Sequence, residues 1–487
     1  MGNQISLPSR RIFVTICASS LLLLPVAQVR ATYADIDLSN AASDSQVSTL
    51  QGAHSSGSLG TSVSDAGDVN GDGFPDIIVG APNADTNGRG RAGAVYLLFG
   101  RAGGFMNVDL AGFVSSDSTG FIVQGNGQEE SDDYYYNGST TPNTRWRGDN
   151  LGISVSGAGD MNNDGFSDIV VGAPNASLNG IVGAGAVYVI LGKKEGFSTV
   201  DLAGFVSSDS TGFIVQGAVE YFNLGTSVSG AGDVNNDGFS DIVLGAHHAS
   251  FYGKGTTGAV YVLFGRAGGF STVDLADFVS SDSTGYMIQG AEAGDNLGIS
   301  VSGAGDMNND GFSDVVVGAS QASPNLRLRA GAVYVILGKK EGFSTVDLVG
   351  FVSSDSTGFI VQGAVEYFNL GTSVSGAGDV NGDGCDDVII GAPRASPSFK
   401  WGVKRSAGVA FVILGKKKGF ATVDVARLSS SDSTGYMIQG AEGRDDSEGD
   451  NLGTSVSGAG DANGDGLADG PSTGRPSPSR APIATAS

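Results

Sequence analysis

The side chains best suited to chemistry in this chain are the aspartates and asparagines of a nine-residue motif that occurs six times. Its first copy reads Asp68-Val-Asn70-Gly-Asp72-Gly73-Phe-Pro-Asp76. Oxygen-bearing side chains at alternate positions are the ligands that calcium prefers, and the seventh residue can add its carbonyl. Glycine at the sixth position permits the positive φ that closes such a loop. The motif therefore predicts a calcium site in each copy.

The predicted ligands follow the same pattern in every copy, with the seventh residue acting through its backbone. An EF-hand would need a glutamate at the twelfth position, where five copies carry strand hydrophobes such as Val79, so an EF-hand or dockerin helix is excluded. A turn without metal is the alternative, but three carboxylates so close together repel one another without a cation. The full set is Asp68, Asn70, Asp72, Phe74, Asp76; Asp160, Asn162, Asp164, Phe166, Asp168; Asp233, Asn235, Asp237, Phe239, Asp241; Asp306, Asn308, Asp310, Phe312, Asp314; Asp379, Asn381, Asp383, Cys385, Asp387; and Asp461, Asn463, Asp465, Asp469.

Each motif lies inside a longer repeat, and successive motifs start 92, 73, 73, 73 and 82 residues apart. Short runs rich in Val, Ile, Tyr and Phe surround it, such as Asp168-Ile-Val-Val-Gly-Ala, and Gly, Asp or Ser bounds each run. This pattern indicates four strands per repeat. A four-stranded sheet cannot bury both faces alone, and radial stacking into a β-propeller solves that problem. A linear solenoid is the alternative, but the units are too large for it.

The predicted fold class is therefore all-β, a β-propeller of four-stranded antiparallel blades. The segment 36–53 matches a fourth strand, five full repeats follow from Leu59, and a sixth stops at Asp469. Residues 470–487 form a Pro/Ser-rich tail that we expect to be disordered. This abrupt change suggests truncation or a shifted reading frame, so ring closure stays open.

The N-terminus is typical of an export signal over residues 1–31, which leaves the propeller at 32–469. Arg10 and Arg11 precede an apolar run that is too short to span a membrane, and either an ordinary or a twin-arginine signal fits. No later run is long enough for a membrane anchor, so we expect a secreted, extracellular, periplasmic or cell-surface protein. The net charge of −24 argues against nucleic-acid partners. Cys385 remains alone after signal removal, and we expect it to be a buried hydrophobe.

The pattern Leu-Gly-x-Ser-Val-x-x-Ala-Gly-Asp-x-Asn-x-Asp-Gly-x-x-Asp-Ile-x-Val-Gly-Ala-Pro resembles the FG-GAP repeat of the integrin α-subunit propeller over residues 36–469. The resemblance implies a propeller, usually of seven blades, with calcium in the hairpin between strands one and two. Leu59 and its counterparts replace the Phe of the family pattern, and the blade number falls short. Similar repeats occur in glycosylphosphatidylinositol-specific phospholipase D, but its His-rich zinc catalytic domain has no counterpart here.

Loops that differ between repeats are the candidate ligand-binding surface. We call residues 83–92, 175–184, 247–257, 320–330 and 394–407, with the insertion 126–149, the variable loops. Large and basic side chains in these loops suit protein or glycan recognition, although drift of solvent-exposed loops would give the same variation. The candidate ligand-binding residues are Tyr135, Trp146, Tyr252, Arg327 and Trp401.

These observations favour a calcium-binding adhesion or ligand-binding module without catalytic residues. Arg147-Gly148-Asp149 spells the tripeptide that integrins recognise, but Gly-Asp recurs at Gly294 in the same context, so we interpret it as part of the repeat. The rival hypothesis is an enzyme, for which the His247-His248 pair is the available general base. A truncated structural fragment is the third hypothesis.

Overall fold

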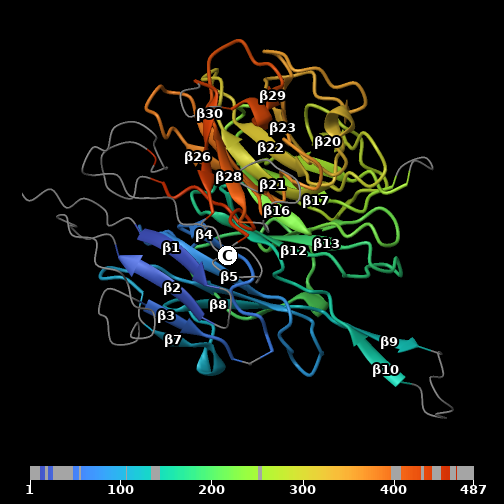
Figure 1. The fold of residues 1–487 in the computed structure, drawn as a ribbon. Helices are drawn as coiled ribbons and strands as arrows, with labels where there is room; N and C mark the ends of the chain where they lie inside the picture. Colours follow the sequence, from blue (N-terminus) through green and yellow to red (C-terminus); the bar gives the residue numbers. More distant parts are fainter. Residues whose placement is uncertain are drawn as a thin grey trace, which may run out of the picture.

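The computed structural model describes residues 11–16, 20–25, 48–53, 56–105, 107–132, 143–250, 255–395, 407–428, 433–440, 451–460 and 468. These residues form successive small β-sheets, and Figure 1 shows the sheets following one another in chain order around a common centre. The predicted all-β propeller with four-stranded antiparallel blades is confirmed.

Five blades are complete, and each contains four antiparallel strands in chain order. Blade I contains β4 (Val63–Gly67), β5 (Asp76–Ala81), β6 (Ala94–Leu98) and β8 (Gly120–Gln124). Blade II contains β11 (Val155–Gly159), β12 (Asp168–Ala173), β13 (Ala186–Ile190) and β15 (Gly212–Gln216). Blade III contains β16 (Ser227–Gly232), β17 (Asp241–Ala246), β18 (Ala259–Leu263) and β20 (Gly285–Gln289). Blade IV contains β21 (Leu297–Gly305), β22 (Asp314–Ala319), β23 (Ala332–Ile336) and β25 (Gly358–Gln362), and blade V contains β26 (Ser373–Gly378), β27 (Asp387–Ala392), β28 (Val409–Ile413) and β30 (Gly435–Gln439).

The burial of each strand explains its sequence pattern. All residues of β12 and β13 are buried, because both faces of these middle strands pack against neighbouring blades, and both strands read as continuous apolar runs. The fourth strand, such as β8, alternates buried and half-buried residues. The core lies between blades: Val187 of blade II shares a cluster with Leu244 of blade III. Each blade therefore depends on its neighbours for burial.

The connection between strands three and four begins and ends on the side of the aspartate loops, because these two strands are antiparallel, and in between it extends along the preceding blade toward the opposite face. Within it, a two-residue strand pairs in parallel with the fourth strand of the preceding blade. These edge strands are β7 (Val108–Asp109), β14 (Val200–Asp201), β19 (Val273–Asp274), β24 (Val346–Asp347) and β29 (Val423–Asp424). Short 3-10 helices η2 (Leu110–Gly112), η3 (Leu202–Gly204) and η5 (Val425–Arg427) follow three of them, and η4 (Pro324–Leu326) lies in a variable loop.

Partial blades flank the five complete ones. The strand β3 (Ser48–Gln51), predicted as a fourth strand, pairs with β2 (Ser20–Pro25), which pairs with β1 (Arg11–Ile16). Both β1 and β2 fall within the segment predicted to be an export signal, and that signal stays a prediction. At the other end, Val456 packs with Ala377 of blade V. The tail 470–487 lies outside the described residues.

An additional hairpin joins blades I and II. It consists of β9 (Gln128–Asp132) and β10 (Asn143–Arg147), and it projects away from the blades in Figure 1. It belongs to the insertion that the sequence placed among the variable loops.

Candidate functional site

The aspartate loops lie between strands one and two, as predicted, and a repeated set of hydrogen bonds holds them. In the first copy, Asp68 Oδ1 accepts from Asp72 N at 3.0 Å and Asp68 Oδ2 accepts from Gly73 N at 2.8 Å. Asn70 Oδ1 accepts from the same Asp72 N at 3.0 Å, so the oxygens of the first and third positions converge on one amide. Asp72 Oδ1 accepts from Phe74 N at 2.9 Å. The same bonds recur in the loops of blades II to V.

The aspartate at the ninth position is fully buried in the loops of all five complete blades. In blade I, Asp76 Oδ2 accepts from Val69 N at 2.9 Å and Oδ1 accepts from Gly100 N at 2.7 Å. Burial raises the pKa of this carboxyl above its usual value, and the nearby loop carboxylates raise it further, although the backbone hydrogen bonds lower it. The pKa rises to about 7 in Asp76, Asp168 and Asp387 and to about 8 in Asp241 and Asp314.

The donor set of each loop suits a hard cation, but the side chains do not stand as a finished coordination shell. Among the described residues, no group of three or more Asp, Glu, His or Cys side chains is gathered closely enough to hold a metal ion. The loop oxygens accept backbone N–H bonds instead, so a cation would draw the first, fifth and ninth carboxylates toward one point. Cys385, at the seventh position of its loop, is buried, as its place among Phe residues predicted. The sixth loop lies outside the described residues except for Ala468.

Neighbouring loops are joined directly across the blade interface. Ser167 N, at the eighth position of the second loop, donates to Asp68 O at 3.0 Å, and Asp68 N donates to Ser167 Oγ at 3.1 Å. Gly67 is in the left-handed region at φ 71, and a Cβ there would collide with Ser167. The same backbone bond joins Ser240 to Asp160, Ser313 to Asp233, Asp386 to Asp306 and Ala468 to Asp379.

The near-identical sequences of the connections between strands three and four also have a structural cause. Asp117 of blade I accepts from Phe197 N of blade II at 2.6 Å, and Ser115 Oγ bonds Thr199 Oγ1 at 2.8 Å. Equivalent bonds join blades II to V, in which the backbone N of a Phe donates to an Asp of the preceding blade: Phe270 to Asp209, Phe343 to Asp282 and Phe420 to Asp355. The Ser-Ser-Asp-Ser-Thr-Gly segment of one blade therefore receives the Gly-Phe-Ser-Thr-Val-Asp or equivalent segment of the next.

The structure gives a structural role to one candidate ligand-binding residue. Arg327 binds both oxygens of Asp424 in the next blade at 2.9 Å and donates to Gly363 O at 2.9 Å. Burial raises the pKa of Asp424, but the hydrogen bonds from Arg327 and Ala426 outweigh it and hold the pKa below its usual value. Trp146 lies in β10 opposite Glu129. Tyr135, Tyr252 and Trp401 lie outside the described residues.

Exposed apolar residues that sequence reasoning missed lie on the same face as the variable loops. Leu326 is 95% exposed, and Leu328 and Tyr367 are also exposed. Tyr367 N donates to Leu328 O at 2.8 Å, which places the link between blades IV and V against the variable loop of blade IV. The equivalent link between blades II and III exposes Val219 and Tyr221. Two copies of Ala-Val-Glu-Tyr-Phe-Asn in the sequence were the available signal.

The Arg147-Gly148-Asp149 tripeptide does not form an exposed recognition motif. Asp149 is 4% exposed, and its Oδ2 accepts from Asn126 N at 3.1 Å and Gly127 N at 3.0 Å. Its counterpart Asp295 is also buried and accepts from Glu292 N at 3.2 Å. This agrees with the interpretation that Gly-Asp belongs to the repeat.

The histidine pair lies at the start of the variable loop of blade III. The two rings are 4.0 Å apart, and His248 Nδ1 lies 2.8 Å from Asn223 Oδ1. Burial lowers the pKa of His247 to about 4, and the neighbouring His248 contributes to that shift. His247 is therefore neutral near pH 7. The amide of Asn223 is the partner of His248, whereas His247 Nδ1 is buried and has no hydrogen-bond partner among the described residues.

Comparison with known proteins identifies the repeats. The FG-GAP repeat model matches residues 60–98, 151–190, 224–263, 297–336 and 370–413, one match for each complete blade. Each match begins within two residues of a Leu-Gly pair and contains the aspartate loop.

Two groups of relatives share these repeats. Phosphatidylinositol-glycan-specific phospholipase D of Bos taurus is 33% identical over 175 residues, which are 36% of this chain and 19% of that protein. Integrin alpha pat-2 of Caenorhabditis elegans is 30% identical over 273 residues, 53% of this chain and 19% of that protein. Integrin alpha-5 of Xenopus laevis is 33% identical over 177 residues, 35% of this chain and 14% of that protein. The chain thus spans less than a fifth of each relative.

Membrane-spanning helices were searched for separately. In the part of the chain that the structure describes, every helix is too short or too polar to cross a bilayer.

Proposed function

This chain is an FG-GAP repeat protein that resembles the integrin α-subunit propeller, and from that premise we propose that it is a secreted or cell-surface calcium-binding module for ligand binding or adhesion. Its partner is a protein or a glycan, and it acts without catalysis. The proposal rests on a division of the molecule into a metal-loop face, which carries the aspartate loops, and a variable-loop face at the other ends of the strands.

Calcium is proposed because the loops contain oxygen ligands only and carry negative charge that no cationic side chain in the loop offsets. Each complete loop places three carboxylates and one amide within nine residues, and its ninth carboxylate is buried with a raised pKa. A divalent cation would neutralise this charge, and oxygen-only ligands suit calcium better than zinc or copper. In blade II, Asp160, Asn162, Asp164 and Asp168 would hold the ion with the carbonyl of Phe166.

Ligand binding is assigned to the variable-loop face because exposed apolar side chains from two different segments meet there. Leu326, Leu328 and Tyr367 are exposed around the junction of blades IV and V, where burial would stabilise a partner. Exposed valines also occur on the connections between strands three and four, at Val114, Val206, Val279 and Val352. On the metal-loop face, the Asp side chains that recur in the connections between strands three and four already form hydrogen bonds to the next blade. The exposed apolar cluster is the observation that carries the proposal.

Attachment of cells or immobilised matrix proteins and glycans, measured with and without calcium, tests this function. Leu326→Ser with Tyr367→Ser should reduce attachment at least severalfold while the melting curve stays nearly unchanged, because both side chains are exposed. Val206→Ser is the matched control, since Val206 is 74% exposed on an inter-blade connection. Unchanged attachment by the double variant and by Tyr252→Ala and Trp401→Ala would overturn the face assignment.

The alternative function is a hydrolase-associated propeller, which the similarity to the phospholipase D of Bos taurus favours. Phosphate-ester turnover lost in His247→Ala or His248→Ala would support it. His247 is a weak candidate base in its present surroundings, because it has little tendency to take up a proton near pH 7.

A further inference from the structure

Two blade junctions are closed by the same arginine–aspartate pair. Arg89, in the variable loop of blade I, binds Asp201 of the next blade at 2.7 Å, and Arg327 binds Asp424 at 2.9 Å. Each arginine is the eighth residue after the alanine that ends strand two. Each aspartate ends an edge strand and pairs in register with a glutamine, Gln124 or Gln362, of the preceding blade.

The junction between blades II and III has the same backbone but lacks the cation. Asp274 pairs in register with Gln216, as the other aspartates do with their glutamines, but Ile181 occupies the arginine position. Among the described residues, no lysine or arginine forms an ion pair with Asp274. Gln216 is 2% exposed, and its Nε2 has no hydrogen-bond partner there. Because isoleucine replaces the arginine, the Asp274 carboxylate lacks the cationic partner that Asp201 and Asp424 have.

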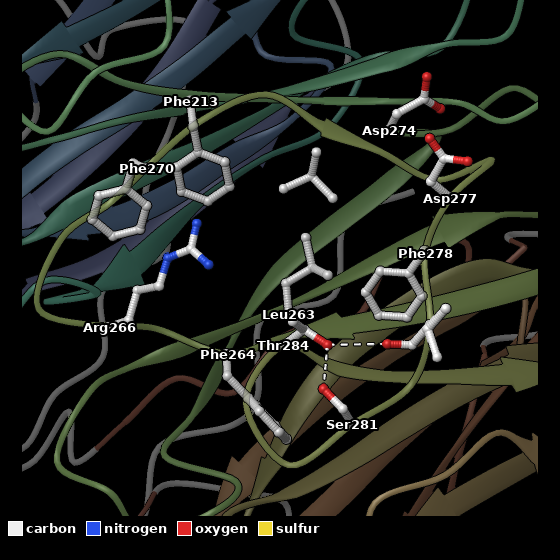
Figure 2. Close-up of a pocket in the computed structure, with 12 residues that line it drawn as sticks. Phe213, Leu263, Phe264, Arg266, Phe270, Asp274, Asp277, Phe278, Ser281 and Thr284 are labelled. Atoms are coloured by element: carbon white, nitrogen blue, oxygen red, sulfur yellow. Dashed lines mark hydrogen bonds between the residues drawn. The ribbon is translucent and has the colours of Figure 1, made fainter.

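A second carboxylate strengthens the negative charge at this junction. Asp277 stands where blades I, II and IV carry Gly112, Gly204 and Gly350. Asp277 N donates to Asp274 O at 3.1 Å, which keeps the two residues together. Both carboxylates lie on the same side of the pocket that Figure 2 shows, and Asp274 Oδ1 accepts from Ala276 N at 2.9 Å; among the described residues, no lysine or arginine forms an ion pair with either carboxylate.

A pocket of about 350 Å³ opens beside these carboxylates (Figure 2). Phe213 and Phe270 line it as a stacked pair with ring centroids 5.0 Å apart, and Leu263 and Phe278 complete the apolar wall. Figure 2 shows Asp274 and Asp277 together on one side and Arg266 beside Phe270 on the other. The Arg266 guanidinium lies 5.4 Å from the centre of the Phe270 ring and donates to Gly269 O at 3.0 Å, so it is already engaged.

We propose that this pocket binds a small organic cation that carries an aromatic body, with its ammonium group on Asp274 and Asp277 and its ring against Phe213 and Phe270. The ammonium group pairs with Asp274 as Arg89 and Arg327 pair with Asp201 and Asp424. The volume is within the range of small-molecule sites, and aromatic walls with a few converging polar groups are typical of them. Charge complementarity selects an amine over a neutral or acidic analogue. The site uses none of the proposed calcium ligands, but its wall adjoins two aspartate loops, because Gly265 N donates to Asp241 Oδ1 at 2.9 Å and Arg266 N donates to Met161 O at 2.8 Å.

Calorimetry and chemical-shift titration with 4-phenylbutylamine, in saturating calcium, test the proposal. We expect the amine to bind about tenfold more tightly than 4-phenylbutanol, and 4-phenylbutanoate to bind more weakly still, since charge-assisted hydrogen bonds are stronger than neutral ones. Asp274→Asn with Asp277→Gly should reduce amine binding to the level of the alcohol. Equal affinity for all three probes would overturn the proposal.

The chain supplies its own matched variant. Ile181→Arg introduces the arginine found at the junctions of blades I and II and of blades IV and V, so it should pair with Asp274, abolish amine binding and leave the melting temperature equal or slightly higher. Ile181→Leu is the control and should bind as the wild type does. Retained amine binding in a folded Ile181→Arg protein would show that the missing arginine does not define the site.

Discussion

The metal-loop face and the variable-loop face lie at opposite ends of the same strands, but they differ in which contacts recur from blade to blade. On the metal-loop face, every complete blade repeats the same loop hydrogen bonds, and each loop is bonded to the next through its eighth residue. On the variable-loop face, an arginine–aspartate pair closes the junctions at Asp201 and Asp424, whereas Asp274 has no such ion pair among the described residues. One face therefore stabilises the packing of successive blades, while the other tolerates change.

This difference follows from what each loop must satisfy. A change in an aspartate loop leaves buried N–H groups without acceptors in its own blade and alters a bond to the next blade. Many changes in a variable loop remove only an exposed or half-exposed contact, although these loops also contain buried residues such as Asp149 and Thr257. Variation accumulates where its free-energy cost is small, and binding surfaces can arise there.

Removing calcium should cause the largest effect, because all proposed sites lie on the metal-loop face. If free calcium exceeds the dissociation constant about tenfold, each site adds about 1.4 kcal/mol, so five independent sites add roughly 7 kcal/mol. We therefore expect excess chelator to lower the melting temperature by many degrees, and added calcium to restore it. Identical calorimetric transitions with and without chelator would contradict the calcium assignment.

Removing one buried loop carboxylate should cause the next largest effect. Asp168→Ala leaves Met161 N and Gly192 N, which donate to Asp168 at 2.8 Å, without acceptors. We expect a loss of about 3 kcal/mol in the free energy of unfolding. Urea denaturation in calcium-free buffer measures this difference in the free energy of unfolding without any contribution from bound metal. Glu195→Gln, at an exposed position of the same blade, is the control, and equal stabilities of the two variants would show that this face is not rigidly held.

A pH effect of intermediate size should arise at Asp295, which lies between blades III and IV near the variable loops. Burial raises its pKa to about 6 from the usual 3.8, with Glu292 contributing. Because the folded pKa is the higher one, the stability from protonation is full below about pH 4 and is lost as the pH rises through 6. The wild-type protein should lose on the order of 2 kcal/mol in its free energy of unfolding between pH 4 and 7. Asp295→Asn should not show this loss, because asparagine does not ionise. Parallel stability curves for the two proteins would refute this.

The smallest effect should come from the variable-loop face itself. Arg327→Ile gives the junction of blades IV and V the isoleucine that the junction of blades II and III has. We expect a loss of about 1 kcal/mol or less in the free energy of unfolding, because ion pairs near the surface contribute little. A double-mutant cycle with Asp424→Asn isolates the pair. A coupling energy as large as the effect of Asp168→Ala would remove the distinction between the two faces.

The sequence by itself determined the four-stranded repeat, the number of complete blades and the oxygen-rich loops. These features are local: alternating and continuous apolar runs, turn glycines and a nine-residue motif are visible within one repeat. The burial of Cys385 and the assignment of Gly148-Asp149 to the repeat also followed from comparing copies. The calcium ligands and the export signal stay predictions.

Only the tertiary structure decided which residues meet across blades. The edge strands pair residues 58 to 77 positions apart. The bonds from Ser167 to Asp68 and from Asp117 to Phe197, and the pairing of Arg327 with Asp424, join residues 80 to 99 positions apart. The pocket beside Asp274 likewise needs Phe213 from one blade and Phe278 from the next. No pattern within a single repeat encodes such contacts, because each depends on how two separately formed sheets pack.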